Sequence, residues 1–389
     1  MSKPLIDYTR TLKEWSTSEC RPYAREADSR HELPQKWREI LDTAPVPLGR
    51  SDRPGSEPVP EFEDGYWVTR LAFYEAVAYG DVWALQALGN GIGHLVVQAA
   101  GTPEQVERWY KPVMERGLAT GFALTEPHFG SDTSQVAATA VRDGDSWIIN
   151  GNKIFCSYGA SSEYVVVFAT IDPAQGGKGI RAFVVEKGTP GFAVVKPNEH
   201  KMGIRAWVTS ALAFDDCRIP VQNGLGWRDG ELKPDLRGQA AALATLALNR
   251  PNISGMAIGI TQAAIDLTND LLNEQKSEFT RLRWSRAAEE LAQMNVTLER
   301  GRRAARHAQR LLDLGRSDRL TAASAKAFAP HSCERIIRRC MQLLGPDGAS
   351  EDLLLEKWYR DMKIMDIFEG SGEIQRLIVA RELIGKSAA

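Results

Sequence analysis

The sequence lacks the patterns that mark disulfide-rich and metal-binding proteins. Its five cysteines are odd in number and include no CxxC, and its six histidines are scattered without an HxxH or HExxH. A disulfide framework or a zinc site would need such spacings. We therefore expect free thiols in a cytosol-like compartment and no bound metal.

Long apolar runs and a strong charge of one sign are also missing. No run approaches the ~20 apolar residues that cross a bilayer, and the charged N-terminus has no secretory apolar segment. Lysines and arginines number 48 against 50 aspartates and glutamates, a net charge of -2. Nucleic acids and anionic membrane surfaces select for positive charge, so we expect neither as the main partner. The arginines from Arg300 to Arg319 follow Glu299 and are interrupted by Asp313 and Asp318, which is typical of a solvated helix face.

What the chain does contain is three stretches that differ in their predicted secondary structure. Its 389 residues, 43% of them hydrophobic, fit a globular protein of two or three domains. Residues 1–121 are mainly helical in pattern, 122–237 carry short strands, and 238–389 are helical again. Because no helix-length pattern separates the strands, an antiparallel barrel or sandwich is favoured over a parallel sheet.

Individual elements follow from the same patterns. Helices are predicted over 67–88, 103–116, 239–273, 287–314 and 321–344. Strands are predicted over 146–152, 164–171, 180–186 and 192–196. A loop rich in proline, glycine and serine is predicted over 45–60.

No standard phosphate-binding loop is present. Gly89, Gly91 and Gly93 begin like a dinucleotide motif, but His94 stands where its last glycine would be, and a helical pattern precedes them. A Rossmann loop follows a strand, so these glycines predict a break between helices. Neither a Walker A motif nor GxSxG occurs.

Two segments are candidates for chemistry. Residues 121–132 (GFALTEPHFGSD) lie where helix gives way to strand, which suits a ligand in a domain crevice and equally suits a plain interdomain loop. In residues 367–376 (IFEGSGEIQR), Glu369 follows an apolar pair. A glutamate in an apolar loop has a raised pKa and can act as a general base near neutrality. Ser371 could instead cap a helix that begins near Ile374, and the two roles are compatible.

Four sequence motifs, taken in their order along the chain, resemble those of a known protein family. They are FALTEPxxGSD at 122–132, NGNK at 150–153, FDDxRIP at 214–220 and IFEGSGEIQR at 367–376. Together they resemble the acyl-CoA dehydrogenase family, and the resemblance runs from about residue 12 to 385. It implies an α+β fold with a helical N-terminal domain, a middle antiparallel β-barrel and a C-terminal four-helix bundle.

The resemblance also implies a function. It implies an FAD-dependent oxidoreductase of fatty-acid β-oxidation that acts on an acyl-CoA thioester, with electron-transfer flavoprotein as the acceptor. A homodimer, a homotetramer or a hetero-oligomer with a related chain is implied, in the cytoplasm or in the mitochondrial matrix of a eukaryote. In that family a carboxylate removes the α-proton while the β-hydride passes to N5 of FAD. The thioester carbonyl must be polarised for this step, in a dry site.

By resemblance, Glu369 is the base and its backbone N–H binds the thioester oxygen. Some family members carry the base just before an arginine at the start of the bundle. Here that position is Asn249, before Arg250, and an amide cannot serve as the base.

The remaining implied site residues bind cofactor or substrate. Phe155 stands where tryptophan is common, and Ser157 stands where threonine bonds near N5 of the flavin. Arg250 is implied near the substrate, and it could instead form a salt bridge in the bundle. The implied flavin contacts are Phe122, Leu124, Thr125, Ser131, Phe155, Ser157, Gln342, Gly345, Ile364, Phe368, Ser371 and Glu373. The implied substrate contacts are Ser131, Arg250 and Gly370.

Departures from the family pattern concern the far half of the flavin site. The arginine that holds the FAD pyrophosphate of a neighbouring subunit is replaced by Gln275, or by Lys276 if the alignment slips one residue, and neither offers a bidentate fork. Arginines at 281, 283 or 286 could substitute. A glycine-rich stretch reads Gly345, Pro346, Asp347, Gly348 here, with Gln342 retained before it. Trp207 stands where serine is usual and could shape the acyl pocket or a surface loop.

The sequence therefore leaves several functions open. An acyl-CoA dehydrogenase is favoured by Glu369 and the intact 122–132 motif. A partner subunit of a heteromeric dehydrogenase, with a degraded FAD half-site, is suggested by Gln275 and Pro346. An acyl-CoA oxidase or flavin monooxygenase shares the scaffold, although a monooxygenase needs no such base, and a non-enzymatic binding protein is the last alternative. The acyl chain, and whether its carrier is CoA or a carrier protein, are left open.

Overall fold

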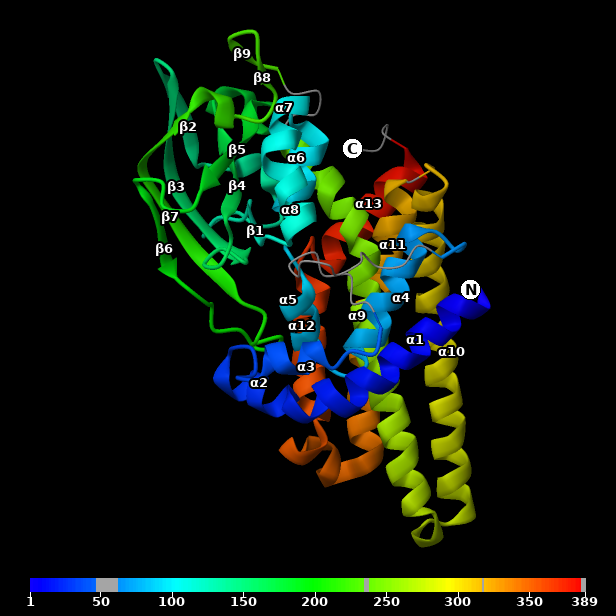
Figure 1. Cartoon of the computed structure of the whole chain (residues 1–389). Coiled ribbons are helices and arrows are strands. Elements are labelled where there is room, and N and C mark those ends of the chain that lie inside the picture. The colour runs from blue at the N-terminus through cyan, green and yellow to red at the C-terminus, as the bar shows by residue number, and fades with distance from the viewer. Residues whose placement is uncertain (47–61, 234–237, 317, 386–389) are drawn as a thin grey trace.

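A computed structural model describes residues 1–46, 62–233, 238–316 and 318–385. The predicted loop over 45–60 lies outside the described residues from position 47 onward. Figure 1 shows a curled β-sheet on one side, a helical bundle on the other, and the first helices crossing beneath both. This arrangement confirms the predicted fold class. Among the described residues, no helix combines the length and the apolarity needed to cross a membrane.

The N-terminal region is helical, as predicted. Its α-helices are α1 Lys3–Trp15, α2 Ala24–Arg30, α3 Trp37–Asp42, α4 Tyr66–Ala78, α5 Trp83–Leu88, α6 Gly93–Ala100, α7 Pro103–Gln105 and α8 Lys111–Arg116. The predicted helix over 103–116 is present, with a π-helical turn Val106–Tyr110 between α7 and α8. Thr102 begins it with a capping box to Gln105.

The single helix predicted over 67–88 is wrong, because the chain breaks between α4 and α5. A Cβ on Gly80 would lie 2.1 Å from the backbone oxygen of Ser16, so the segments that follow α1 and α4 approach too closely there for a side chain. Asp81 is buried and pairs with the buried Lys357. Both causes are contacts far along the chain, which periodicity does not report. The break predicted at Gly89–Gly93 is confirmed, since α5 ends before Gly89 and α6 begins at Gly93.

The sheet has seven strands, with a small hairpin beside it. The strands are β1 Thr120–Ala123, β2 Thr139–Asp143, β3 Ser146–Ser157, β4 Tyr164–Thr170, β5 Ile180–Glu186, β6 Phe192–Lys196 and β7 Thr209–Pro220, and the hairpin is β8 Trp227–Arg228 with β9 Glu231–Leu232. Their order is β1-β4-β2-β3-β7-β6, with β5 on β4. The four predicted strands are present, and β1, β2 and β7 were not placed by the sequence.

The sheet is mostly antiparallel, but β4 makes two parallel pairings, with β1 and at one position with β2. The parallel pairing is possible because the β2–β3 hairpin lies in the connection from β1 to β4 and supplies the needed crossover length. Every residue of β4 is buried, since one face meets the sheet core and the other meets helices α6 and α9.

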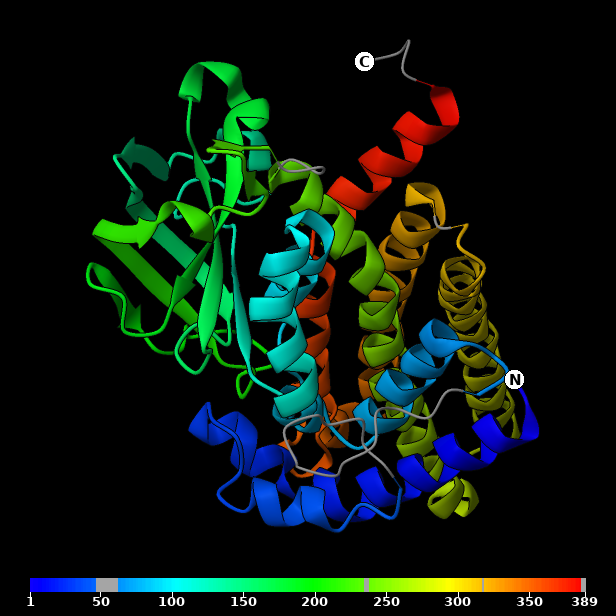
Figure 2. The same ribbon diagram turned by 45° about the horizontal axis from the view of Figure 1, so that its top comes forward.

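The C-terminal region is a bundle of long helices. They are α9 Gly238–Glu274, α10 Arg281–Asp313, α11 Arg319–Leu344, α12 Leu355–Ile367 and α13 Gly372–Ile384. The three predicted helices are present, with α10 beginning six residues earlier than the pattern indicated. Figure 2 shows α13 rising away from the bundle.

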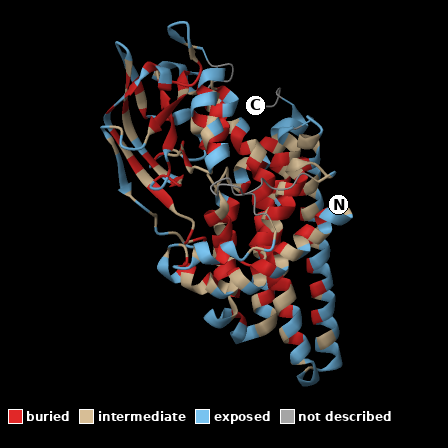
Figure 3. Ribbon diagram, in the orientation of Figure 1, coloured by how far each residue is buried: buried red, intermediate tan, exposed pale blue. Residues whose placement is uncertain are grey.

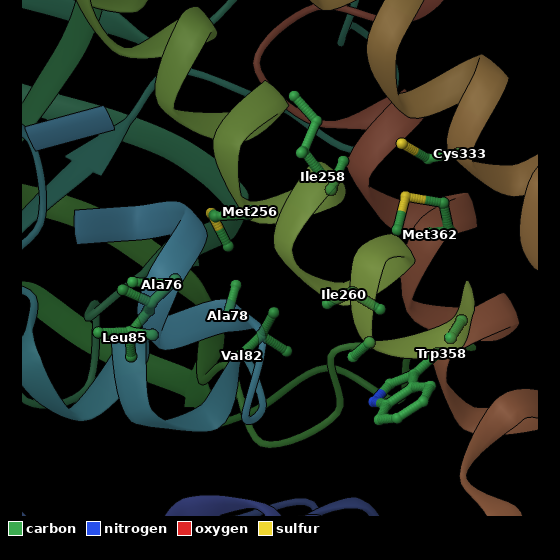
Figure 4. Packing of buried hydrophobic residues seen from close by; sticks show 14 of the residues in the cluster. Ala76, Ala78, Val82, Leu85, Met256, Ile258, Ile260, Cys333, Trp358 and Met362 are labelled. Carbon is green, nitrogen blue, oxygen red and sulfur yellow. The ribbon is translucent and has the colours of Figure 1, made fainter. Parts of the chain in front are cut away.

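Apolar side chains between α4, α9, α11 and α12 form the main core. Figure 3 shows the buried residues gathered on the facing sides of these helices. In Figure 4, Met256 and Ile260 of α9 lie between Ala76 of α4 and the α12 residues Trp358 and Met362. This core fixes the position of the α12–α13 junction, where the candidate base lies.

Candidate active site

The loop between α12 and α13 carries Glu369 in a strained conformation. Glu369 has φ +57° and Gly370 has φ +91°, both in the left-handed region, which costs a non-glycine residue about 1 kcal/mol or more. Lys326 of α11 is fully buried, and its Nζ donates to the backbone oxygens of Asp366 at 2.6 Å and Gly370 at 2.8 Å. The loop is therefore held from both sides of Glu369.

The two readings of this loop are compatible in the structure. Ser371 is the N-cap of α13, and its hydroxyl accepts from the backbone N–H of Ile374. Glu373 lies exposed in the first turn of α13, where the helix dipole favours a carboxylate. Glu369 meanwhile keeps its side chain among buried polar groups.

The Glu369 carboxyl has one bonded oxygen and one free oxygen. Oε1 accepts from Nδ2 of Asn249, whereas Oε2 is buried without a partner in the described part of the chain. Burial raises the pKa of Glu369 to about 7, against the opposing effects of Asn249, Arg250 and other nearby cations. The carboxyl can therefore exchange a proton near neutral pH through Oε2.

Arg250 lies directly beside this carboxyl and is almost fully buried. Its Nε donates to the backbone oxygen of Glu369 at 3.2 Å. Across the described ranges it forms no ion pair, so the alternative of a bundle salt bridge is not what the structure contains. Burial, its largest influence, lowers the Arg250 pKa, and the Glu369 charge opposes that effect.

A buried ion pair joins two of the sequence motifs. Nζ of Lys153 lies 2.7 Å from Oε1 of Glu126 and donates to the backbone oxygen of Leu124 at 3.1 Å. Glu126 also accepts from the backbone N–H groups of Ala137 and Ala138. Burial lowers the pKa of Lys153 to about 8. The sequence indicates both motifs, but not the pair that connects them, because its two residues lie 27 positions apart.

The 122–132 motif is thereby held against β3. Thr125 accepts through its backbone oxygen from the N–H of Ile154, and the backbone oxygen of Phe122 accepts from Sγ of Cys156. Leu124 is buried and Phe122 and Thr125 are half-buried, whereas Ser131 is exposed. The structure brings these predicted residues together, with Ser131 at the edge of the group.

Phe155 and Ser157 lie at the end of β3. Phe155 has φ +53°, and its residue is 55% exposed, an unusual position for a large aromatic ring. Oγ of Ser157 accepts from Nε1 of Trp207 at 3.2 Å. Trp207 is half-buried and packs against the same core cluster as Ile364 and Phe368 of the α12 end. Its indole therefore holds the Ser157 hydroxyl from the side of the main core.

Gln342 and Gly345 lie far from Glu369. They stand at the C-terminal end of α11, and the 13 residues of α12 separate that end from Glu369 by about 20 Å. Both are exposed, and a Cβ on Gly345 would meet nothing within 4 Å. Within one chain, the predicted flavin residues therefore form two separate groups.

A pocket of about 290 Å³ lies at this distant end, beside the turn from α9 to α10. Its lining includes Arg283, Arg286, Arg339 and Phe279. The Arg283 guanidinium lies 4.3 Å from the Phe279 ring centre, and Arg339 is bonded to Glu290. Gln275, at the end of α9, is half-buried. Two of the arginines that the sequence offered as substitutes thus line one cavity.

The site includes residues that sequence reasoning missed. Lys326 gave no local signal beyond a lysine in a buried helical stretch. Asn249 was noted only as a residue unable to act as the base, although its amide donates to the base. Asn252, three positions later, could have been found as a second polar residue on an apolar helix face.

Comparison with known proteins agrees with this geometry. Residues 121–217 match the model of the acyl-CoA dehydrogenase middle domain, and residues 237–384 match that of its C-terminal domain. The chain is 33% identical over 380 residues to the mitochondrial short-chain specific acyl-CoA dehydrogenase of Bos taurus, covering 96% of this chain and 88% of the relative. It is 32% identical over 288 residues to a subunit of the caffeyl-CoA reductase-Etf complex of Acetobacterium woodii, covering 74% of each.

A solved structure extends the likeness to three dimensions. Butyryl-CoA dehydrogenase from Megasphaera elsdenii superposes with a TM-score of 0.85 at 27% identity, over 99% of each chain. The chain belongs to the acyl-CoA dehydrogenase family. It is accordingly an oxidoreductase that dehydrogenates an acyl-CoA, and its family is flavin-dependent in general.

Proposed function

We propose that this chain is an FAD-dependent enzyme that forms the α,β double bond of an acyl-CoA, with Glu369 as the base. The observation that carries the proposal is the buried Glu369 carboxyl with one oxygen fixed and Oε2 free. Oε2 takes the α-proton of the thioester. Since burial raises the Glu369 pKa to about 7, the carboxylate is a stronger base than an exposed one and is still substantially ionised near neutrality.

The backbone around Glu369 polarises the substrate. The Glu369 N–H donates to no acceptor among the residues that the structure describes, so it is free to bind the thioester oxygen and make the α-proton more acidic. Arg250 holds the neighbouring carbonyl and keeps this N–H in place. Gly370 and Ser131 complete our proposed substrate contacts, together with Arg250.

The residues on the sheet side fit the ring of a flavin. The exposed Phe155 offers a free aromatic face, and Ser157 accepts from Trp207, which leaves its O–H free to donate. Bound FAD would supply the acceptor for the β-hydride at N5. Our proposed contacts of this first group are Phe122, Leu124, Thr125, Ser131, Phe155 and Ser157 on the sheet side. Ile364, Phe368, Ser371 and Glu373 are our proposed contacts at the junction of α12 and α13.

The second group of flavin residues supports an oligomer. Gln342, Gly345 and the arginine pocket lie about a helix length from Glu369 and would bind the pyrophosphate end of a flavin held by another chain. A homodimer or homotetramer follows if that chain is a second copy. A hetero-oligomer is the second candidate, favoured by the replacement of the expected arginine by Gln275. We also propose electron-transfer flavoprotein as the acceptor, because a relative is named for a complex with Etf.

An anaerobic titration tests the proposal. The purified protein should carry a yellow flavin, and a panel of acyl-CoAs of increasing length should bleach its visible band. Glu369→Gln should retain the flavin and lose bleaching by about 10²–10⁴-fold in rate. Unchanged bleaching in that variant would show that Glu369 is not the base. A chain that stays colourless with added FAD would instead favour the hetero-oligomer.

A further inference from the structure

Three buried amides form a hydrogen-bonded chain that ends on Glu369. Gln309 of α10 donates through Nε2 to Oδ1 of Asn252 at 2.7 Å, and Asn252 of α9 donates through Nδ2 to Oδ1 of Asn249 at 3.1 Å. Asn249 then donates through Nδ2 to Oε1 of Glu369. Gln309 and Asn252 are fully buried, and Asn249 is nearly so.

The direction of this chain is set by the carboxylate. An ionised carboxyl only accepts, so the amide NH₂ of Asn249 must face Glu369 and its oxygen must face Asn252. The same reasoning turns the NH₂ of Asn252 toward Asn249 and that of Gln309 toward Asn252. Three amide dipoles are therefore aligned with their positive ends toward Glu369, and hydrogen bonds aligned in this way polarise one another.

Core packing alone does not account for three amides at this position. A buried amide costs free energy unless its groups are bonded, and Oε1 of Gln309 is buried without a partner in the described part of the chain. Gln309 therefore donates one hydrogen bond, to Asn252, while its own oxygen accepts none from the described residues. Apolar side chains of similar size would fill the same space at no such cost.

We propose that Asn252 and Gln309, acting through Asn249, are positioning residues that fix Oε1 of the Glu369 base and so present Oε2 to the substrate. This inference rests on the proposed role of Glu369. It adds to the site a residue of α10, Gln309, which lies 60 positions before the base in the sequence. The amide chain favours the ionised carboxyl. It acts together with the cations that face Glu369 from the surrounding helices, namely Arg250 of α9, Lys326 of α11 and Arg70 of α4.

Isosteric substitutions test the proposal on the flavin-loaded enzyme. In Gln309→Met and Asn252→Leu, we expect the rate of flavin bleaching by a saturating acyl-CoA to fall by about 3-fold and 10-fold or more. The acid limb of the pH–rate profile should move to higher pH by about 0.5–1 pH unit. The reason is that the ionised Glu369 carboxylate loses a stabilising hydrogen-bond chain, so its pKa rises. The affinity for the acyl-CoA should change less than about twofold, since neither residue contacts substrate.

A double-mutant cycle separates a chain from independent packing effects. Asn252→Leu already disconnects Gln309 from the base, so adding Gln309→Met should change rate and pH profile no further. The proposal would be overturned if the rate losses of the two single variants multiplied in the double variant. It would also be overturned if the pH–rate profile stayed in place in every variant. If Gln309→Met does not fold, Gln309→Asn keeps an amide that is too short to reach Asn252 and should reproduce the same shift.

A matched control removes a buried amide elsewhere. Gln105 bonds to backbone groups of residues 222, 224 and 226 beside the sheet. Gln105→Met should lower the melting temperature and leave the pH profile unmoved. A similar profile shift in this variant would overturn the proposal by assigning the effect to stability. The proposed function fails separately, if Glu369→Gln still bleaches the flavin.

Discussion

The two ends of the helical bundle differ in how their positively charged side chains are placed: at one end they are buried, and at the other they are exposed. Where α12 meets α13, Lys326 and Arg250 are buried and donate to the backbone of the loop that carries Glu369. Beside the α9–α10 turn, Arg283 and Arg286 are exposed around an open pocket. Buried charges are costly and need fixed partners, so they suit a single defined proton transfer. Exposed arginines cost little and suit a polyanion such as a pyrophosphate.

This difference bears on how a nearly neutral chain would bind the polyanionic cofactor that we propose. A net charge of -2 supplies no general attraction for phosphate. Binding of the proposed FAD would therefore depend on a few local groups. We propose that the arginine pocket supplies them, at the end of the bundle where Gln275 stands in place of the expected arginine. The buried end can then be kept dry for chemistry.

The largest effect is expected from removing a charge at the buried end. Lys326→Met deprives the backbone oxygens of Asp366 and Gly370 of a buried donor, so the loop around Glu369 should loosen. We expect turnover to fall by about 10²-fold and the free energy of unfolding by about 2–4 kcal/mol. Lys187→Met, at an exposed lysine, is the control and should change stability by less than about 0.5 kcal/mol. Equal effects of the two substitutions would contradict the comparison.

The second effect concerns the exposed end. We expect the Arg283→Ala/Arg286→Ala double variant to weaken FAD binding by about 10²-fold, since each charge-assisted bond is worth roughly 1.5–3 kcal/mol. The FAD dissociation constant, measured by flavin fluorescence, checks this. The same enzyme saturated with FAD should turn over normally. Arg300→Ala, an exposed arginine on the same helix, is the control. FAD affinity that is the same in all three proteins would remove the pyrophosphate role from this pocket.

The same contrast shows what the sequence can predict. Local patterns were enough for β5 and β6, whose predicted and observed ranges coincide, and for the break at Gly89–Gly93. The helix over 67–88 was mispredicted because its break depends on contacts of Gly80 with Ser16 and of Asp81 with Lys357, residues far apart in the chain.

The site follows the same rule. Glu369 could be singled out from its motif, and Arg250 from the resemblance to the family, which implies an arginine near the substrate. The contributions of Lys326 and Gln309 could not, because they act over 44 and 57 positions of sequence on Gly370 and Asn252, respectively. Only the packing of α10 and α11 against α9 and the α12 end brings these side chains to the loop.

The smallest effect is a stability gain at the buried end. The Glu369 pKa is raised by burial to about 7, above the ~4.3 of an unfolded glutamate, so the folded state holds this proton more tightly. The stability contributed by that proton is complete below pH ~4.3 and is lost as the pH rises through about 7. At pH 8 the ionised carboxylate therefore opposes folding.

Glu369→Gln should thus be more stable than the parent at pH 8, by on the order of 2 kcal/mol, and the difference should shrink steadily toward pH 5. Urea unfolding of both flavin-free proteins across this range measures it. Glu163→Gln, which removes an exposed carboxylate, controls for the change in net charge. If Glu369→Gln is no more stable at pH 8 than at pH 5 relative to the parent, burial is not raising the base's pKa. The buried end would then differ from the exposed end only in geometry.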